Sequence, residues 1–212
     1  MITLYDYWRS SAAYRLRIAL GLLDLPYTAI PVNLLTGEHL GPEYSARNPQ
    51  ALVPTLEIDG LTLTQSLAVL EYLDEAHQAG FLPKDPAGRA RTRALSYAIA
   101  MEIHPICNLS VARYAVDASA GAISMQGWMQ HFITKGLTAL ERMLDTADTG
   151  RFCHGNSVSM ADICLVPQMF NADRWGVDVT SFSRITAIIG NLDQIPAVRA
   201  AHPDQHQPKD KP

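Results

Sequence analysis

The sequence has 212 residues, of which 48% are apolar and 18% are charged, so it can bury a core and is not a wholly disordered chain. Its 17 basic and 21 acidic residues give a formal net charge of −4, which provides no general attraction to nucleic acid or anionic lipid. No apolar run approaches the roughly 18 residues of a membrane helix, and the N-terminus does not resemble a secretory signal. We therefore expect neither nucleic acid nor a membrane as a partner.

The cysteines are few and scattered along the chain, at Cys107, Cys153 and Cys164, without a C-x-x-C pair. This pattern argues against a disulfide framework and against a structural zinc site, so it predicts a reducing, cytoplasmic location. His202 and His206 are four residues apart, but they lie in a polar C-terminal stretch that we expect to be solvated. The sequence therefore predicts no metal site.

The N-terminal part, residues 1–82, alternates between strand and helix patterns. The expected elements in chain order are a strand at 2–5, a helix at 12–23, a strand at 27–32, a hairpin of 55–58 and 61–64, and a helix from residue 66. Ser10 and Ser11 are candidate N-caps of the first helix, and Asp59-Gly60 is a strong hairpin-turn signal. The strand–helix–strand order implies a parallel pair and the hairpin adds antiparallel strands, so we predict a small mixed α/β sheet.

The rest of the chain carries almost no strand pattern. Residues 83–88 (PKDPAG) are typical of a linker, because two prolines and a glycine interrupt the periodicity. Beyond the linker we expect an all-helical domain over 89–200 and a polar, flexible tail over 201–212. The helical signals are a periodic pattern over 89–104 that Pro105 ends or kinks, an apolar stripe from Met129 to Leu144, and a capping box formed by Ser159 and Asp162.

Three features of the N-terminal part would together form a binding site. Residues 8–11 (WRSS) link a strand to a helix, where hydroxyls and backbone N–H groups can hold an anion, although two serines there can equally be simple caps. Val53 must be extended ahead of Pro54, so its backbone can pair with a peptide-like ligand as an added strand. Gln65 and Ser66 start a helix directly after a strand, which suits a carboxylate. Each of these signals is weak when taken alone.

Taken together, five segments resemble the zeta-class glutathione transferases, a class that includes the maleylacetoacetate and maleylpyruvate isomerases. The resemblance extends over residues 1–195 in the right order and spacing, and its most specific part is the S-S-x-x-x-R-x-R-I-A-L run. The segments are residues 8–20 (WRSSAAYRLRIAL), 48–56 (NPQALVPTL), 65–73 (QSLAVLEYL), 108–111 (NLSV) and 161–168 (ADICLVPQ).

The resemblance implies a thioredoxin-like α/β N-terminal domain with a cis proline at Pro54, an all-α C-terminal domain, a homodimer, and glutathione as cofactor. It also implies a glutathione site, position by position. The residues are Ser10 and Ser11 at the sulfur, Val53 and Pro54 at the cysteinyl backbone, Gln65 and Ser66 at the γ-glutamyl end, His39 at the glycine end, and His104, Asn108 and Ser110 at the mouth of the cleft.

The implied activity is a glutathione-dependent cis–trans isomerisation of a maleyl-type keto dicarboxylate, maleylacetoacetate or maleylpyruvate, to its fumaryl isomer. It proceeds by thiolate addition, bond rotation and elimination. We expect Ser10 to be the principal donor to the thiolate and Ser11 to assist. Arg9 and Arg174 are the expected ligands of the substrate carboxylates, because a planar guanidinium meets a carboxylate in a bidentate way.

The chain departs from the zeta-class pattern at Ala12, where many members have a cysteine beside the glutathione sulfur. Activation of that sulfur must therefore come from the serines and the backbone. Asn108 is followed by Leu109-Ser110 rather than by the arginines of some maleylpyruvate isomerases, which favours maleylacetoacetate on that segment. Two alternatives stay open: a transferase that conjugates or dehalogenates small α-halo acids, and a non-catalytic member that binds ligands or a partner protein.

Overall fold

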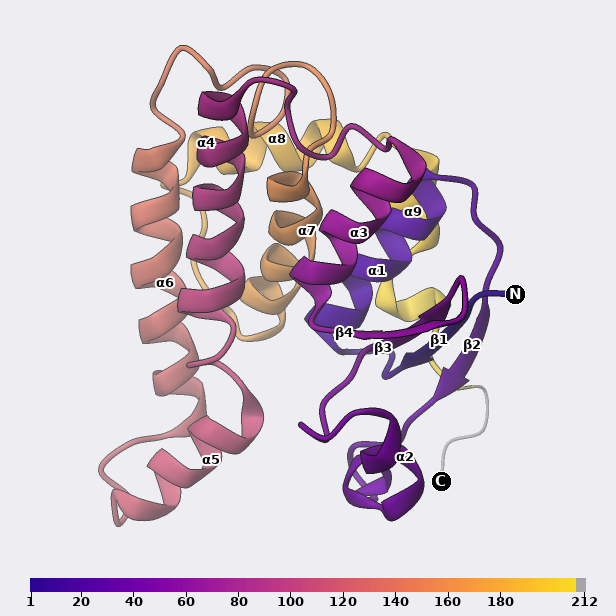
Figure 1. Cartoon of the computed structure of the whole chain (residues 1–212). Coiled ribbons are helices and arrows are strands. Elements are labelled where there is room, and N and C mark those ends of the chain that lie inside the picture. The colour runs from indigo at the N-terminus through magenta and orange to yellow at the C-terminus, as the bar shows by residue number, and fades with distance from the viewer. Residues whose placement is uncertain (209–212) are drawn as a thin grey trace. The chain divides into compact units, whose positions relative to one another are not determined.

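The computed structural model describes residues 1–208, which form two units that we consider one at a time (Figure 1). The first unit comprises residues 1–81 and 194–208, and the second comprises residues 82–193.

The predicted domain boundaries differ from these units in two places. The sequence placed residues 194–200 with the helical domain, whereas in the structure they group with the first unit. It also placed the whole of 83–88 in a linker, but a helix already begins at Pro86, because Asp85 caps it by accepting a hydrogen bond from the Gly88 N–H at 2.7 Å.

The first unit contains the small mixed sheet that the sequence predicts, and its four strands have the order β2-β1-β3-β4. The strands are β1 (Thr3–Asp6), β2 (Thr28–Pro31), β3 (Thr55–Ile58) and β4 (Leu61–Thr64). β1 is parallel to β2 and antiparallel to β3, and β3 forms the expected hairpin with β4. Asp59 and Gly60 at the hairpin turn both have positive φ, which the tight turn requires.

Two helices, α1 (Ser11–Leu22) and α3 (Ser66–His77), lie side by side on one face of this sheet (Figure 1). The short α9 (Pro196–Ala200) packs against α1. The link that the sequence left irregular contains a 3₁₀ turn, Glu38–Leu40, and α2 (Pro42–Arg47). The core between sheet and helices consists of aliphatic side chains that are at most 2% exposed, including those of Leu4, Leu16, Ile18, Leu56, Ile58, Leu70 and Leu73.

The C-terminal stretch is anchored to the first unit, so the prediction of a flexible tail is wrong for residues 201–208. Ala201 is 4% exposed, and its carbonyl accepts a hydrogen bond from Arg17 Nε at 3.1 Å. Arg17 is buried in α1 and also forms an internal salt bridge, with both carboxylate oxygens of Asp6 at 2.7 and 2.8 Å. A buried guanidinium needs acceptors for its donors, and the tail supplies one of them. Residues 209–212 lie outside the described part of the chain.

The second unit is helical, as predicted, and α7 is its central helix. Its elements are α4 (Pro86–Tyr97), a π-helix η2 (Ala98–Ile103), α5 (Leu109–Ala118), α6 (Met125–Met143), α7 (Met160–Arg174) and α8 (Ser183–Leu192). α7 contacts α4, η2 and α8. The predicted capping box is confirmed, since Asp162 accepts from the Ser159 N–H at 2.8 Å and from the Ser159 hydroxyl at 2.6 Å. Within residues 1–208, no helix is long and apolar enough to cross a bilayer.

Candidate functional site

The strand register brings the three predicted segments of the first unit to one end of the sheet. Tyr5, near the end of β1, pairs with Thr55 at the start of β3, and Thr55 pairs with Thr64 at the end of β4. The segment after β1, the segment before β3 and the segment after β4 therefore leave the sheet at the same end. The segment that follows β2 joins them there, because β2 runs parallel to β1.

Ser10 is the N-cap of α1, and Ser11 is the first residue of that helix. The Ser10 backbone is extended, and its Oγ accepts a hydrogen bond from the Ala13 N–H at 3.2 Å. This arrangement confirms that Ser10 caps the helix, yet it uses the hydroxyl only as an acceptor, so the O–H hydrogen can still be donated to an anion. The helix start adds its own N–H groups and the positive end of the helix dipole.

The Val53–Pro54 peptide bond is cis, as the resemblance implies. The preceding Leu52 carbonyl is fixed by two donors, the Tyr44 hydroxyl at 2.7 Å and the Asn48 amide at 2.6 Å. Within residues 1–208, no group pairs with the backbone N–H or C=O of Val53. Val53 therefore offers a fixed, extended backbone edge to which a peptide-like ligand can add.

Gln65 and Ser66 form the junction between β4 and α3. Gln65 has φ 66° and ψ 104°, a backbone conformation that is uncommon for a residue with a side chain and is found at functional sites. Its side-chain amide donates to Gln50 Oε1 at 2.7 Å. Ser66 is 6% exposed, and its Oγ accepts from Arg15 at 3.0 Å. Among residues 1–208, no side chain caps the N-terminus of α3, so its first N–H groups are available to a carboxylate.

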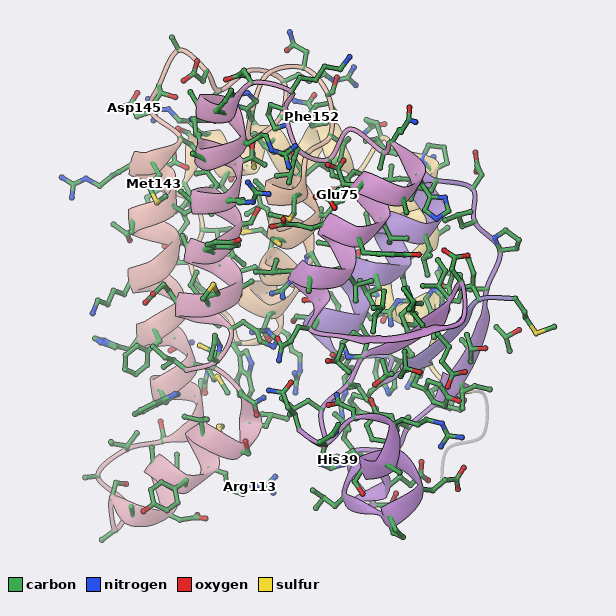
Figure 2. The ribbon with its side chains drawn as sticks, in the orientation of Figure 1. His39, Glu75, Arg113, Met143, Asp145 and Phe152 are labelled. Atoms are coloured by element: carbon green, nitrogen blue, oxygen red, sulfur yellow. The ribbon has the colours of Figure 1, made fainter. Side chains whose placement is uncertain are left out.

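His39 lies in the 3₁₀ turn next to α2 (Figure 2). Its Nδ1 atom is buried and has no hydrogen-bond partner within the described residues. Buried polar atoms are nearly always paired, so this nitrogen keeps hydrogen-bonding capacity for a bound polar group or a water molecule. His39 is thus a credible contact for a polar group bound at this end of the sheet.

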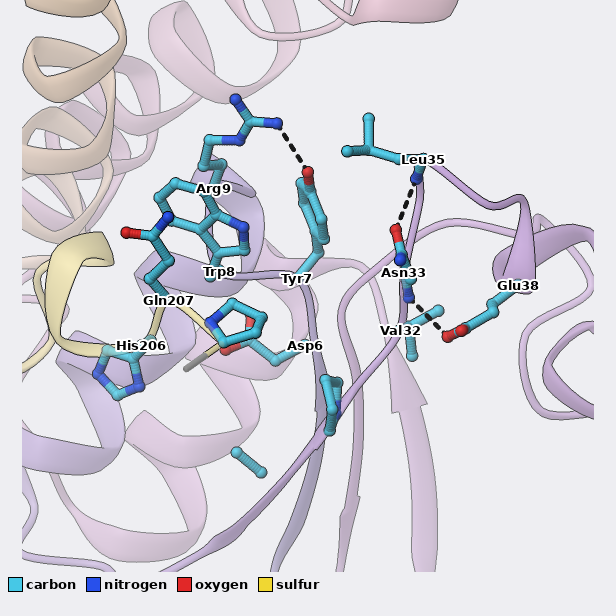
Figure 3. A pocket seen from close by; sticks show the side chains of 13 residues that line it. Asp6, Tyr7, Trp8, Arg9, Val32, Asn33, Leu35, Glu38, His206 and Gln207 are labelled. Carbon is cyan, nitrogen blue, oxygen red and sulfur yellow. Dashed lines mark hydrogen bonds between the residues drawn. The ribbon is translucent and has the colours of Figure 1, made fainter. Parts of the chain in front are cut away.

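The guanidinium of Arg9 lies over two aromatic rings, next to Ser10 and Ser11 in the sequence. Its guanidinium carbon lies 4.8 Å from the centre of the Trp8 ring and 5.8 Å from that of Tyr7, and its NH2 donates to the Tyr7 hydroxyl at 2.9 Å. Figure 3 shows Arg9 at the rim of a cavity of about 730 Å³ in the first unit. The cavity is lined by Asp6, Tyr7, Trp8, Arg9, Ala29, Pro31, Val32, Asn33, Leu35, Glu38, His206, Gln207 and Pro208.

The remaining predicted site residues belong to the second unit. His104 follows the π-helix, and Asn108 caps α5 by accepting from the Ser110 N–H at 3.0 Å and the Ser110 hydroxyl at 2.9 Å. Arg174 is exposed at the end of α7, with its guanidinium carbon 5.1 Å from the centre of the Trp175 ring. The structure gives Asn108 and Ser110 a clear local role in capping, and any contact of these four residues with a ligand stays a prediction.

Residues 1–75 match the family model for the N-terminal domain of glutathione S-transferases. Over 207 residues, 97% of each chain, the sequence is 55% identical to maleylacetoacetate isomerase from Rhizobium meliloti. The chain belongs to the maleylacetoacetate isomerase family. The family that the motifs indicated is thereby confirmed, and so is the combination of a thioredoxin-like domain with a helical domain.

Solved structures agree with this membership of the isomerase family. The holo structure of a bacterial zeta-class maleylpyruvate isomerase superposes with a TM-score of 0.92 at 37% identity, covering 99% of this chain and 100% of that one. A maleylacetoacetate isomerase from Methylobacterium extorquens AM1, solved with malonate and glutathione bound, gives a TM-score of 0.90 at 34% identity over 99% and 100% of the two chains.

Three further residues contribute to this site but were not predicted from the sequence: Arg15, Gln50 and Tyr44. Gln50 orients the Gln65 amide, Tyr44 fixes the Leu52 carbonyl, and Arg15 fixes the Ser66 hydroxyl. Arg15 and Gln50 lie inside the family motifs, but neither carries a local signal that names its partner. Only the fold brings residues 15 and 66 together.

The chain has no accessible thiol of its own at this family's site. Cys107, Cys153 and Cys164 are all buried, and none of them is in a disulfide. Burial raises the pKa of the Cys107 thiol to about 11, and burial together with the nearby Asp162 carboxyl raises the pKa of Cys153 well above its usual value. Those two thiols remain protonated near neutral pH, so neither of them is suited to act as a nucleophilic thiolate.

Proposed function

We propose that this enzyme converts the cis double bond of a maleyl keto dicarboxylate to the trans form, with glutathione as its cofactor and maleylacetoacetate as its preferred substrate. The observation that carries the proposal is the set of four segments at one end of the sheet: the Ser10–Ser11 helix start, the free Val53 backbone, the Gln65–Ser66 helix start and the unpaired Nδ1 of His39. Each segment offers a group that a charged tripeptide thiol requires.

The residues of the first unit suit glutathione along its whole length. Ser66 and the uncapped start of α3 would hold the γ-glutamyl carboxylate, with the Gln65 amide beside them. The Val53 backbone would pair with the cysteinyl residue, and His39 would reach the glycine carboxylate. Ser10 and Ser11 would then face the sulfur. When bound, glutathione supplies a thiolate that adds to the cis double bond, permits rotation and leaves again with the trans product.

The start of α1 has the features needed to hold that sulfur in its ionised form. A free thiol has a pKa of about 8.5, so lowering the value by about two units requires about 2.7 kcal/mol of preferential stabilisation. The Ser10 hydroxyl accepts from the Ala13 N–H, which polarises its O–H bond and makes it a better donor. The positive end of the helix dipole adds to this effect. Ala12 occupies the position of the cysteine found in many relatives, so the serines and the backbone at the helix start carry this task without a cysteine.

The two carboxylates of the substrate require cations, and we assign Arg9 and Arg174 to them. Arg9 is held on Tyr7 and Trp8 beside the serines, which restricts the guanidinium to one region. Arg174 lies on the ring of Trp175 at the exposed end of α7. We assign His104, Asn108 and Ser110 to the same ligand-binding surface of the second unit. A guanidinium meets a carboxylate with two parallel hydrogen bonds and so orients the diacid as well as attracting it.

An assay on the two candidate acids tests this proposal. Purified enzyme is incubated with maleylacetoacetate or with maleylpyruvate, with and without glutathione, and the trans products are measured by liquid chromatography. The proposal expects turnover only with glutathione and a higher kcat/KM for maleylacetoacetate. Equal or higher kcat/KM for maleylpyruvate would reassign the substrate, and conversion without glutathione would contradict the proposal.

We also propose that the enzyme is a cytoplasmic homodimer. Its buried cysteines form no disulfide among the described residues, which suits a reducing compartment. Each unit exposes large apolar side chains that a partner subunit could cover, namely Leu52 and Leu61 in the first unit and Met101, Leu109, Val111 and Tyr114 in the second, each at least 40% exposed. Sedimentation equilibrium should give twice the mass of one chain, and a monomer at micromolar concentration would contradict the assignment.

A further inference from the structure

Arg15 is a buried cation that connects the two helices at the glutathione end of the sheet. The residue is 2% exposed, and it lies on α1, which packs against α3. Its NH1 group lies 3.0 Å from Ser66 Oγ, at the first residue of α3. A guanidinium has donors only, so the Ser66 oxygen must be the acceptor in this hydrogen bond.

This direction determines what the Ser66 hydroxyl can do. With one lone pair of its oxygen occupied by Arg15, the hydroxyl keeps its hydrogen for a different partner. Within residues 1–208, no group accepts that hydrogen. The N–H groups at the start of α3 have no side-chain cap either, so the hydroxyl and the helix start are together suited to one anion.

We propose that Arg15 is a positioning residue for glutathione, which acts through Ser66 on the γ-glutamyl α-carboxylate. It fixes the hydroxyl as a donor and places a positive charge directly behind it. Two consecutive hydrogen bonds put that charge about 5–6 Å from the carboxylate, a separation at which opposite charges still interact strongly when water is excluded. This inference rests on the function proposed above and names a residue of its cofactor site.

The neighbouring arginine of α1 has a different task. Arg17 directs its guanidinium to the Asp6 carboxylate and to the carbonyls of Ala201 and Trp8. Through these hydrogen bonds Arg17 connects α1 to the C-terminal segment and to the end of β1. We assign none of these partners to the binding of the γ-glutamyl group. The two arginines of the S-S-x-x-x-R-x-R run thus differ in their partners. Arg15 contacts a residue of the proposed cofactor site, whereas Arg17 contacts residues that stabilise the fold.

A simple structural role for Arg15, fastening α1 to α3, predicts a different pattern of binding. The test therefore uses two probes: glutathione, and 4-aminobutyryl-cysteinylglycine, which is glutathione without its γ-glutamyl α-carboxylate. Calorimetry gives the dissociation constants of both for the full-length wild type, Arg15→Met, Ser66→Ala and the double variant. Thermal unfolding of each variant reports on the fold separately.

We expect Arg15→Met to weaken glutathione binding about 10- to 50-fold, and to change binding of 4-aminobutyryl-cysteinylglycine, which keeps only the glycine carboxylate, less than about threefold. Once Ser66 is alanine, the substitution at Arg15 should have a much smaller effect on glutathione, because the hydroxyl through which it acts is gone. Arg15→Lys, which keeps the charge and one donor, should recover part of the affinity.

Equal weakening of both tripeptides by Arg15→Met, or no weakening of glutathione, would overturn the inference. If Arg15→Met does not fold, Arg15→Gln is measured with the same two probes and must show the same selectivity for the carboxylate. Failure of the wild type to bind glutathione would instead contradict the proposed function. The two failures are therefore distinguishable.

Discussion

Ser10 combines a structural and a chemical task in one hydroxyl group. Its oxygen accepts the Ala13 N–H that would otherwise be unpaired at the start of α1, and its hydrogen stays available for the ligand. Replacement by alanine removes both functions at once. An experiment on this residue must therefore separate the loss of the cap from the loss of the donor.

We predict that Ser10→Ala raises the pKa of the bound glutathione thiol by about 1–2 units and lowers kcat/KM about 10- to 100-fold near neutral pH. The rising limb of the activity profile then moves to higher pH, because the thiolate forms later. Thiolate absorbance near 240 nm against pH measures the shift directly. Ser10→Thr keeps both the cap and the hydroxyl and is the matched control. Unchanged absorbance and turnover in Ser10→Ala would show that Ser10 is only a cap.

Arg174 is the second residue whose assignment can be tested alone. We predict that Arg174→Ala lowers kcat/KM for the diacid by the equivalent of about 1.5–3 kcal/mol, because a charge-assisted pair with a carboxylate is lost. Glutathione affinity, measured by calorimetry on the same variant, should stay near the wild-type value. If diacid turnover and glutathione affinity fell together, the arginine would belong to another part of the site.

At the scale of single residues, the sequence motifs predicted the positions but not the contacts. Ser10 as a cap could be predicted, since a serine before an amphipathic run is a local signal. The hydrogen bond between Arg15 and Ser66 spans 51 positions, and that between Gln65 and Gln50 spans 15. No local pattern encodes such pairs, because they exist only once α1, α3 and the loop before β3 have packed.

The π-helix η2 is the element that precedes His104 and Asn108, and its packing depends on a glycine. Gly136 lies in α6, which contacts η2. A Cβ atom on Gly136 would lie 2.3 Å from Ile103 Cγ1 and 2.4 Å from its Cδ1, closer than any normal contact. Ile103 is 2% exposed, so it has little room to move away.

We predict that Gly136→Ala lowers the free energy of unfolding by about 1–3 kcal/mol despite the better helix propensity of alanine, because overpacking outweighs that gain. Gly190 in α8 is the matched control: within residues 1–208, no atom outside its own stretch of helix lies within 4 Å of its added Cβ, so Gly190→Ala should be neutral or stabilising by up to about 1 kcal/mol. Urea denaturation of both variants measures the two values. An unchanged or higher stability of Gly136→Ala would contradict the close packing of α6 on η2.

Several elements could not be predicted from periodicity. The sequence indicated one helix over 89–104, but the structure changes from α4 to the π-helix at Ala98. A π-helix has about one more residue per turn than an α-helix, and six residues are too few to show that difference in the spacing of apolar residues. α2 was missed because it has only six residues, and α5, which has ten, was also missed. The sheet, α1, α3, α6 and the capping box of α7 were predicted, because their signals lie within short stretches of the sequence.

At the scale of the whole chain, the C-terminal residues return to the first unit and complete the surroundings of Arg17. The sequence suggested a solvated tail from its composition, with two histidines, prolines and lysines. That reasoning failed because composition does not reveal that a buried guanidinium in α1 has the Ala201 carbonyl as an acceptor. A second contact holds the C-terminal residues in place: a ring nitrogen of His206 lies 3.0 Å from the Ala200 carbonyl oxygen, at the end of α9.

We predict that a chain ending at Ala200 is less stable than one ending at Pro208 by about 2–4 kcal/mol, because Arg17 Nε loses its acceptor and the buried contacts of Ala201 and Pro203 are removed. Comparing these two truncated chains isolates residues 201–208. Chemical denaturation followed by tryptophan fluorescence measures the difference. Equal midpoints for the two chains would show that the anchored segment contributes nothing to the stability of the first unit.

The central claim is that the cofactor provides the thiolate and is regenerated in each cycle. The most direct measurement is the number of product molecules formed per molecule of glutathione, with maleylacetoacetate in large excess and free thiol counted before and after the reaction. The account predicts many turnovers per glutathione and no loss of free thiol. Consumption of one glutathione for each molecule of substrate would contradict it, because that result describes conjugation rather than isomerisation.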